Sequence, residues 1–131
     1  MKNKTLEELV DPRILDVLER NGWNVNFSNG RETDLEWFSP AGEDFCTTIY
    51  HRNKDRSFVK DFTGMANDFD PEEHAEMWIP MRGRQGTPNS VRELLDDAEA
   101  IAEHLNNTAS ELRQINFGID RTQNDDITLK D

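Results

Sequence analysis

Hydrophobic residues near the start of the chain recur at helical spacing, and the pattern then changes to alternation. The apolar residues among positions 14–18 follow the pair Asp11-Pro12, in which Asp11 is a favoured N-cap and Pro12 a favoured first helical residue. From residue 23 onward, apolar and polar residues alternate with the period of a half-buried strand. The pattern therefore predicts an N-terminal helix that is followed by a β-sheet.

The alternating region predicts three antiparallel strands joined by tight turns. The strands are expected at residues 23–27, 33–38 and 45–51. The dipeptide Asn29-Gly30 is a strong signal for a hairpin turn, and the Pro and Gly within residues 39–42 predict a second turn. Trp23, Val25 and Phe27 are expected to share one face of the first strand, and Cys46 is expected to be a small buried residue. A sheet of this size needs a helical layer over its apolar face.

Helical spacing returns after the third strand and predicts that layer. One helix is expected over residues 58–69, and Asp70-Pro71 predicts the start of a short helix that Pro80 ends. Ser90 and Glu93 form a capping box at the start of a long apolar stripe that continues to residue 112. The predicted fold is α+β: an N-terminal helix, a three-stranded antiparallel meander and three helices packed on one face of the sheet. Residues 1–115 are expected to form one domain, and residues 116–131 a flexible tail.

Composition limits the compartments and ligands that this chain is expected to meet. The single cysteine, Cys46, excludes an internal disulfide and fits a reducing cytoplasm. The first residues carry two lysines but no apolar segment of the secretory type, and no apolar run approaches the ~20 residues that span a bilayer. We therefore expect a cytoplasmic protein that does not bind membranes.

Acidic charge is concentrated in one part of the chain. The net charge is −12, and residues 61–103, with 11 acidic and 3 basic residues, contribute −8 of it. Nucleic acids and anionic membranes attract Lys and Arg, so neither is expected as a direct ligand. A concentrated negative field is instead informative about solubility and protein partners.

The excess charge lies on two of the predicted helices. On a helical wheel, the acidic residues of the long helix lie opposite its apolar stripe; they are Glu93, Asp96, Asp97, Glu99 and Glu103. The preceding short helix adds Glu72, Glu73 and Glu76. If the two helices pack side by side, these eight carboxylates share one surface. That surface is either an ordinary solvated face or a docking site for a basic protein. Arg82 and Arg84, in the basic loop RGRQG, are candidates for a secondary contact with a partner or with the protein's own carboxylates.

No catalytic or metal-binding motif accompanies this charge. His74 lies among acidic residues, but the positions three and four residues later are Met77 and Trp78, which are unsuitable as second ligands. We interpret His74 as a residue at the rim of the core that packs on Phe69. A nucleophilic pair of Cys46 with His51 lacks a recognisable orienting group and oxyanion hole. The RGRQG loop also lacks the phosphate-loop pattern. The sequence predicts no cofactor, no metal and no catalytic residue.

Three segments carry a resemblance to known proteins: SPAGEDFCTTIYH, DFDPEEHAEMWI and VRELLDDAEAIAEHL. Over roughly residues 35–112, the chain resembles a group of small acidic accessory proteins from bacterial mobile elements. Such elements often carry anti-restriction and anti-CRISPR proteins, so the resemblance implies a protein that inhibits a nucleic-acid-binding enzyme by imitating DNA charge. It assigns no site residue. The alternatives are an immunity or accessory protein that binds a basic toxin or other basic protein, and an enzyme of unrecognised type.

Overall fold

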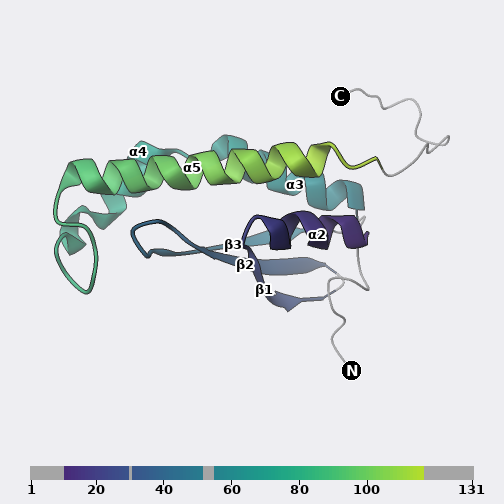
Figure 1. The fold of residues 1–131 in the computed structure, drawn as a ribbon, viewed down its shortest axis with the longest axis horizontal. Helices are drawn as coiled ribbons and strands as arrows, with labels where there is room; N and C mark the ends of the chain where they lie inside the picture. The colour runs from purple at the N-terminus through teal and green to yellow at the C-terminus, as the bar shows by residue number, and fades with distance from the viewer. Residues whose placement is uncertain (1–10, 30, 52–54, 117–131) are drawn as a thin grey trace.

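The computed structural model describes residues 11–29, 31–51 and 55–116 and confirms the α+β fold (Figure 1). The elements follow in the order α2 (Pro12–Arg20), β1 (Asn24–Ser28), β2 (Glu32–Phe38), β3 (Asp44–Tyr50), α3 (Asp55–Asp68), α4 (Pro71–Trp78), the 3-10 helix η1 (Ile79–Met81) and α5 (Val91–Arg113). Apart from Asn116, the predicted flexible tail lies outside the described residues, as does Gly30 of the first predicted turn. Within the described ranges, no helix combines the length and apolar character that crossing a bilayer requires.

The three strands form an antiparallel meander in the order β1-β2-β3. The register places Leu35 opposite Thr47 and Trp37 opposite Phe45, so the inner faces of β2 and β3 together supply the floor of the core. Ile49 is fully buried on the same face, whereas Tyr50 on the opposite face is exposed. This alternation is the one that the sequence predicted for β2 and β3.

The first strand departs from simple alternation because it contains a bulge. Val25 pairs with Leu35, but Phe27 pairs with the neighbouring Asp34, which leaves Asn26 as the extra residue. The bulge turns Phe27 toward the outer face, where it is 38 % exposed. The expectation that Phe27 shares a face with Trp23 and Val25 is therefore wrong.

The residue after Phe27 takes the inward position, and it is polar. The buried Ser28 hydroxyl lies 2.9 Å from Thr33 Oγ1, which in turn lies 2.8 Å from Nε2 of the buried His51. This chain of hydrogen bonds satisfies polar groups that would otherwise be costly to bury. It also places His51 on the inner face of the sheet, whereas Cys46 lies on the outer face, so the two do not form a nucleophilic pair.

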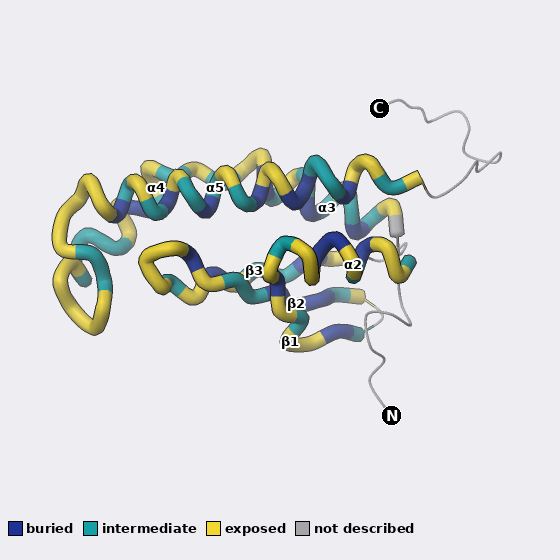
Figure 2. Tube along the Cα trace, viewed as in Figure 1, coloured by how far each residue is buried: buried dark blue, intermediate teal, exposed yellow. Residues whose placement is uncertain are grey.

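The helices supply the layer that covers the inner face of the sheet. Figure 2 shows buried positions recurring along α5, with exposed positions between them. Trp23 lies at the centre of the main core, with its ring packed edge-on against Phe62 and its Nε1 donating to Thr108 Oγ1 at 3.1 Å. A smaller cluster of Ala75, Leu94 and Ala98 joins α4 to α5.

His104 lies at the interface between α5 and the sheet. Its imidazole stacks on the Trp37 ring, with a centroid distance of 3.8 Å and an interplanar angle of 8°. Burial lowers the pKa of His104 below its ordinary value of 6.5, and a hydrogen bond to the Asn21 backbone opposes that effect only in part. The folded protein therefore favours the neutral ring.

The lowered pKa of His104 predicts a loss of stability in mild acid. The unfolded chain protonates this residue near pH 6.5 while the folded protein resists protonation. The contribution of neutral His104 to the free energy of unfolding is therefore fully present above pH 6.5. It is lost as the pH falls through the pKa that His104 has in the folded protein. We expect the free energy of unfolding to fall more between pH 7.5 and 5.5 in the parent than in His104→Gln, as measured by urea titration. Parallel pH profiles for the two proteins would contradict this assignment.

Candidate functional site

Helices α4 and α5 pack side by side, which is the condition that the predicted acidic surface required. Ala75 of α4 lies in the small cluster with Leu94 and Ala98 of α5. Each helix begins at a side-chain cap: Asp70 accepts from the backbone N–H groups of α4, and Ser90 accepts from that of Glu93 on α5. The apolar sides of both helices therefore face inward, and their acidic sides face solvent.

Seven of the eight predicted carboxylates are exposed on these two helices. They are Glu72, Glu73 and Glu76 on α4, and Glu93, Asp96, Glu99 and Glu103 on α5. We call these seven residues the acidic face. None of them forms an ion pair with another residue in the part of the chain that the structure describes. Arg20, by contrast, pairs at 2.8 Å with Glu111, near the C-terminal end of α5. No basic group of the described residues therefore neutralises the charge of the acidic face.

The eighth predicted carboxylate, Asp97, has a different environment. It is half-buried, and its two oxygens accept hydrogen bonds from Ser39 Oγ at 2.6 Å and from the Ala41 backbone N–H at 2.8 Å. The helical wheel placed Asp97 with the outward carboxylates because a wheel contains no information about the turn between β2 and β3. Asp97 instead attaches that turn to α5.

This attachment predicts a stability effect that distinguishes Asp97 from its neighbour. Hydrogen bonds to charged groups contribute about 1.5–3 kcal/mol, so Asp97→Ala should lower the free energy of unfolding by about that amount. Asp96→Ala is the matched control, because Asp96 is exposed and should change stability by less than about 0.5 kcal/mol. Urea unfolding of the two variants measures the difference. Equal effects would show that the turn does not depend on Asp97.

A groove lies where this turn, α4 and the start of α5 meet the loop after η1. Its inner part is a cavity of about 210 Å³, whose polar and aromatic lining includes Glu43, Asp44, His74, Trp78 and Asp97. Its outer part is an open hollow of about 420 Å³, lined in part by Glu93, Asp96 and Asp97. The two parts share Ala41, Gly86, Pro88 and Asp97, so they lie next to each other, and together we call them the groove.

His74 lines the inner part of this groove and is held on two sides. Its ring centroid lies 5.0 Å from that of Phe69, which confirms the predicted packing. Its Nε2 lies 2.8 Å from one carboxylate oxygen of Glu43 and 3.0 Å from the other. Both side chains of this pair are mostly buried, at 14 % and 15 % exposure. The pair fixes one wall of the cavity to the β2–β3 hairpin.

The loop that closes the groove carries Arg82 and Arg84. Gly83 between them has φ +71°, and a side chain there would lie 2.6 Å from Asn89 Oδ1, so this position requires glycine. Its N–H donates to the Pro88 carbonyl at 3.1 Å and closes the loop. Both arginines are exposed, neither lines the groove, and neither pairs with a carboxylate of the described residues.

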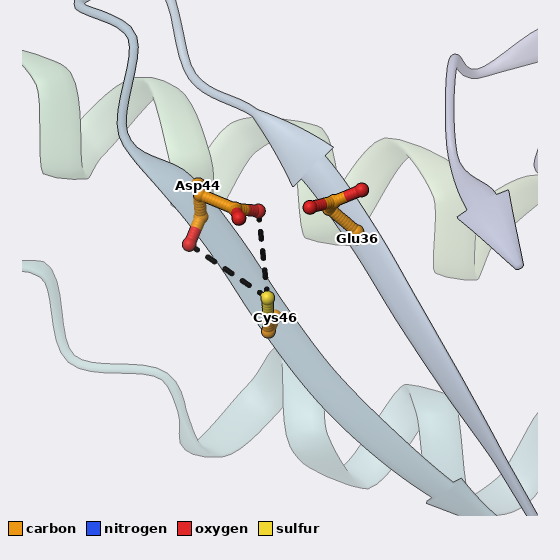
Figure 3. Close-up of side chains that lie close together, drawn as sticks. All are labelled: Glu36, Asp44 and Cys46. Atoms are coloured by element: carbon orange, nitrogen blue, oxygen red, sulfur yellow. Dashed lines mark hydrogen bonds between the residues drawn. The ribbon is translucent and has the colours of Figure 1, made fainter. Parts of the chain in front are cut away.

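A second cluster of titratable side chains lies on the outer face of the sheet. This face is away from α4, which forms one wall of the inner cavity. Glu36, Asp44 and Cys46 bring their potential ligand atoms within 4.8 Å of one another (Figure 3). Cys46 is exposed, so the expectation that it is buried is wrong; Asp44 and Tyr50, on the same face of β3, are exposed as well. The Sγ atom lies 3.4 Å from Asp44 Oδ1.

The protonation states in this cluster disfavour reactive chemistry. The pKa of Cys46 is raised, first by desolvation and then by the hydrogen bond and charge of Asp44. The pKa of Glu36 is also raised, chiefly by its hydrogen bond with Asp44. A thiol must lose its proton to act as a nucleophile or a metal ligand, and this setting opposes that loss. We therefore assign the cluster neither a catalytic nor a metal-binding role.

Comparison of the chain with protein-family models, with curated proteins and with solved structures found no match. The geometry of the acidic face and the groove is therefore the basis on which a function can be proposed. Sequence reasoning identified the acidic face but missed the groove, because its walls come from four separated segments of the chain. The Pro and Gly residues at 40–42 and 80–88 indicated that both segments form turns or loops. They did not indicate that the two segments lie side by side in the fold.

Proposed function

We propose that this protein is a non-catalytic cytoplasmic inhibitor whose acidic face occupies the cationic surface of a nucleic-acid-binding protein. The observation that carries the proposal is the set of seven exposed carboxylates on two packed helices, none of them paired with a basic group in the described part of the chain. Exposed charge of one sign attracts a partner of the opposite sign and accelerates its association.

The spacing of these carboxylates supports competition with nucleic acid. Asp96, Glu99 and Glu103 lie three and four residues apart, so they form a row along one side of α5. Successive turns of a helix are about 5.4 Å apart, whereas DNA presents one charge per about 1.7 Å of its axis. The row is sparser than a phosphate backbone but offers the same kind of contact to a groove lined with Lys and Arg. Glu72 and Glu76 form a second short row on α4.

The resemblance to acidic accessory proteins of bacterial mobile elements supports the same class of target. In that setting the partner would be a restriction or CRISPR enzyme, and the inhibitor would be of the anti-restriction or anti-CRISPR type. No catalytic step is part of this proposal.

Capture of partners from a bacterial lysate tests the proposed function. The immobilised protein should retain a basic nucleic-acid-binding protein at about 50 mM salt and release it by about 200 mM, because salt screens attraction between exposed charges. Added duplex DNA should displace the captured protein. A partner that is retained equally at both salt concentrations and is indifferent to DNA would contradict the proposal.

A further inference from the structure

We propose that the groove beside α5 receives an arginine side chain of the basic partner. This inference rests on the proposed function, because it gives the acidic face a specific anchoring point. The outer part of the groove lies beside Glu93 and Asp96 of the acidic face, and the adjoining inner cavity is lined by Glu43, His74 and Trp78. A basic segment that lies along α5 can therefore extend one side chain into the inner cavity.

The charge of the groove selects a cation. Its acidic lining residues are Glu43, Asp44, Glu93, Asp96 and Asp97, and no Lys or Arg of the described residues lines either part. Among the described lining residues, His74 is the one able to carry positive charge, and it is already in contact with Glu43. An anionic ligand would therefore meet repulsion along the whole groove. A cation would instead be attracted by the acidic residues of both parts of the groove.

The size of the inner cavity favours a single side chain. At about 210 Å³, it is smaller than the roughly 300–1,000 Å³ of pockets that enclose drug-sized ligands. The outer hollow is open and shallow by comparison, which suits a peptide backbone that passes over it. The two shapes together fit a partner segment whose backbone crosses the outer hollow and whose one inserted side chain enters the inner cavity.

The chemistry of the lining favours arginine among the cations. A guanidinium group is planar, binds carboxylates through two parallel hydrogen bonds and stacks on aromatic rings. The cavity offers the carboxylate of Glu43, which also contacts His74, and the indole of Trp78. Guanidinium also loses its hydration more readily than ammonium, which matters in a half-enclosed space. An arginine anchor would be the kind of residue that commonly dominates binding energy at protein interfaces.

Titration with Nα-acetyl-arginine amide tests the anchor directly, with the isotope-labelled protein observed by NMR. The indole N–H signal of Trp78, identified by comparison with Trp78→Phe, should shift together with the backbone signals of residues 41–44 and 85–87. Binding of so small a probe is expected in the millimolar range. Nα-acetyl-citrulline amide, which has nearly the same shape but no charge, is the control probe and should produce no saturable shift at matched salt.

Conservative variants locate the interaction. Glu43→Gln should weaken binding of the arginine probe roughly fivefold, as expected for the loss of one charge about 4 Å away in water. Glu103→Gln removes a carboxylate of the acidic face that does not line the groove, so it should leave probe binding unchanged. The inference would be overturned if the arginine probe changed the chemical shifts no more than the citrulline probe does. It would also be overturned if the arginine probe left the Trp78 indole signal unshifted.

The two proposals fail in distinguishable ways. If a partner is captured in a salt- and DNA-sensitive manner but the arginine probe does not perturb Trp78, the acidic face is functional and the anchor is wrong. If the arginine probe binds at Trp78 but no basic partner is captured, the anchor stands and the proposed inhibitory function is wrong.

Discussion

Replacing Ile101 by Asp is expected to unfold the protein. Ile101 is fully buried on α5, within the main core between the helices and the sheet. An aspartate there would place an unpaired carboxylate in an apolar environment, which costs several kcal/mol even when the group is protonated instead of charged. The total stability of a domain of this size is only about 5–15 kcal/mol, so this single change removes most of it.

A second substitution on the same helix provides the comparison. Leu95 lies beside the smaller cluster and is only partly buried, so Leu95→Asp should lower the melting temperature but leave a cooperative transition. The sequence pattern alone predicts equal damage at both positions, since both belong to one apolar stripe. Thermal melts followed by circular dichroism distinguish the two expectations. An Ile101→Asp protein that melts near the parent's temperature would show that this part of the stripe is not core.

The elements that could be predicted from the sequence are those defined by local periodicity. The long stripe and the Ser90 cap predicted a helix over residues 91–112, and α5 spans Val91–Arg113. The alternation in β2 and β3 also predicted which side chains point inward. These features depend only on residues within a few positions of one another, so a single sequence contains the necessary information.

The features that escaped prediction depend on contacts between distant segments. The bulge at Asn26 inserts one residue into β1, and nothing in the alternation of that strand marks where the register shifts. Asp97 is acidic and helical like its neighbours, yet the turn near Ser39 determines that it points inward. Cys46 was expected in the core because the pattern does not show that the face of β3 that bears Asp44, Cys46 and Tyr50 is exposed.

The same distinction applies to the candidate site. The acidic face follows from helical geometry and charge, so seven of the eight predicted carboxylates occupy the expected exposed positions. The groove requires Glu43 of the hairpin to meet His74 of α4, which lie 31 residues apart in the chain. No local signal encodes that approach. The acidic face could therefore be predicted from the sequence, whereas the groove, which acts together with it in the proposed mechanism, could not.

Reversing three charges of the acidic face should weaken partner binding without unfolding the protein. We select Glu76, Glu99 and Glu103, which are exposed and do not line the groove, for replacement by Lys. Surface changes usually alter stability by less than about 0.5 kcal/mol each. An exposed ion pair contributes about 0.2–1 kcal/mol, and reversal replaces attraction by repulsion. Three reversals should therefore lower affinity for the captured partner at least about fivefold.

The matched control separates the position of the charges from net charge. Asp16, Glu19 and Asp68 are exposed outside the acidic face, and their replacement by Lys changes the net charge by the same amount. If the acidic face binds the partner, the control variant retains most of the affinity, and the salt dependence of binding falls only in the acidic-face variant. Equal losses in the two variants would show that overall charge, and not this surface, attracts the partner. A loss confined to the acidic face, with no displacement by DNA, would instead indicate an immunity-type protein that holds a basic partner away from its nucleic-acid site.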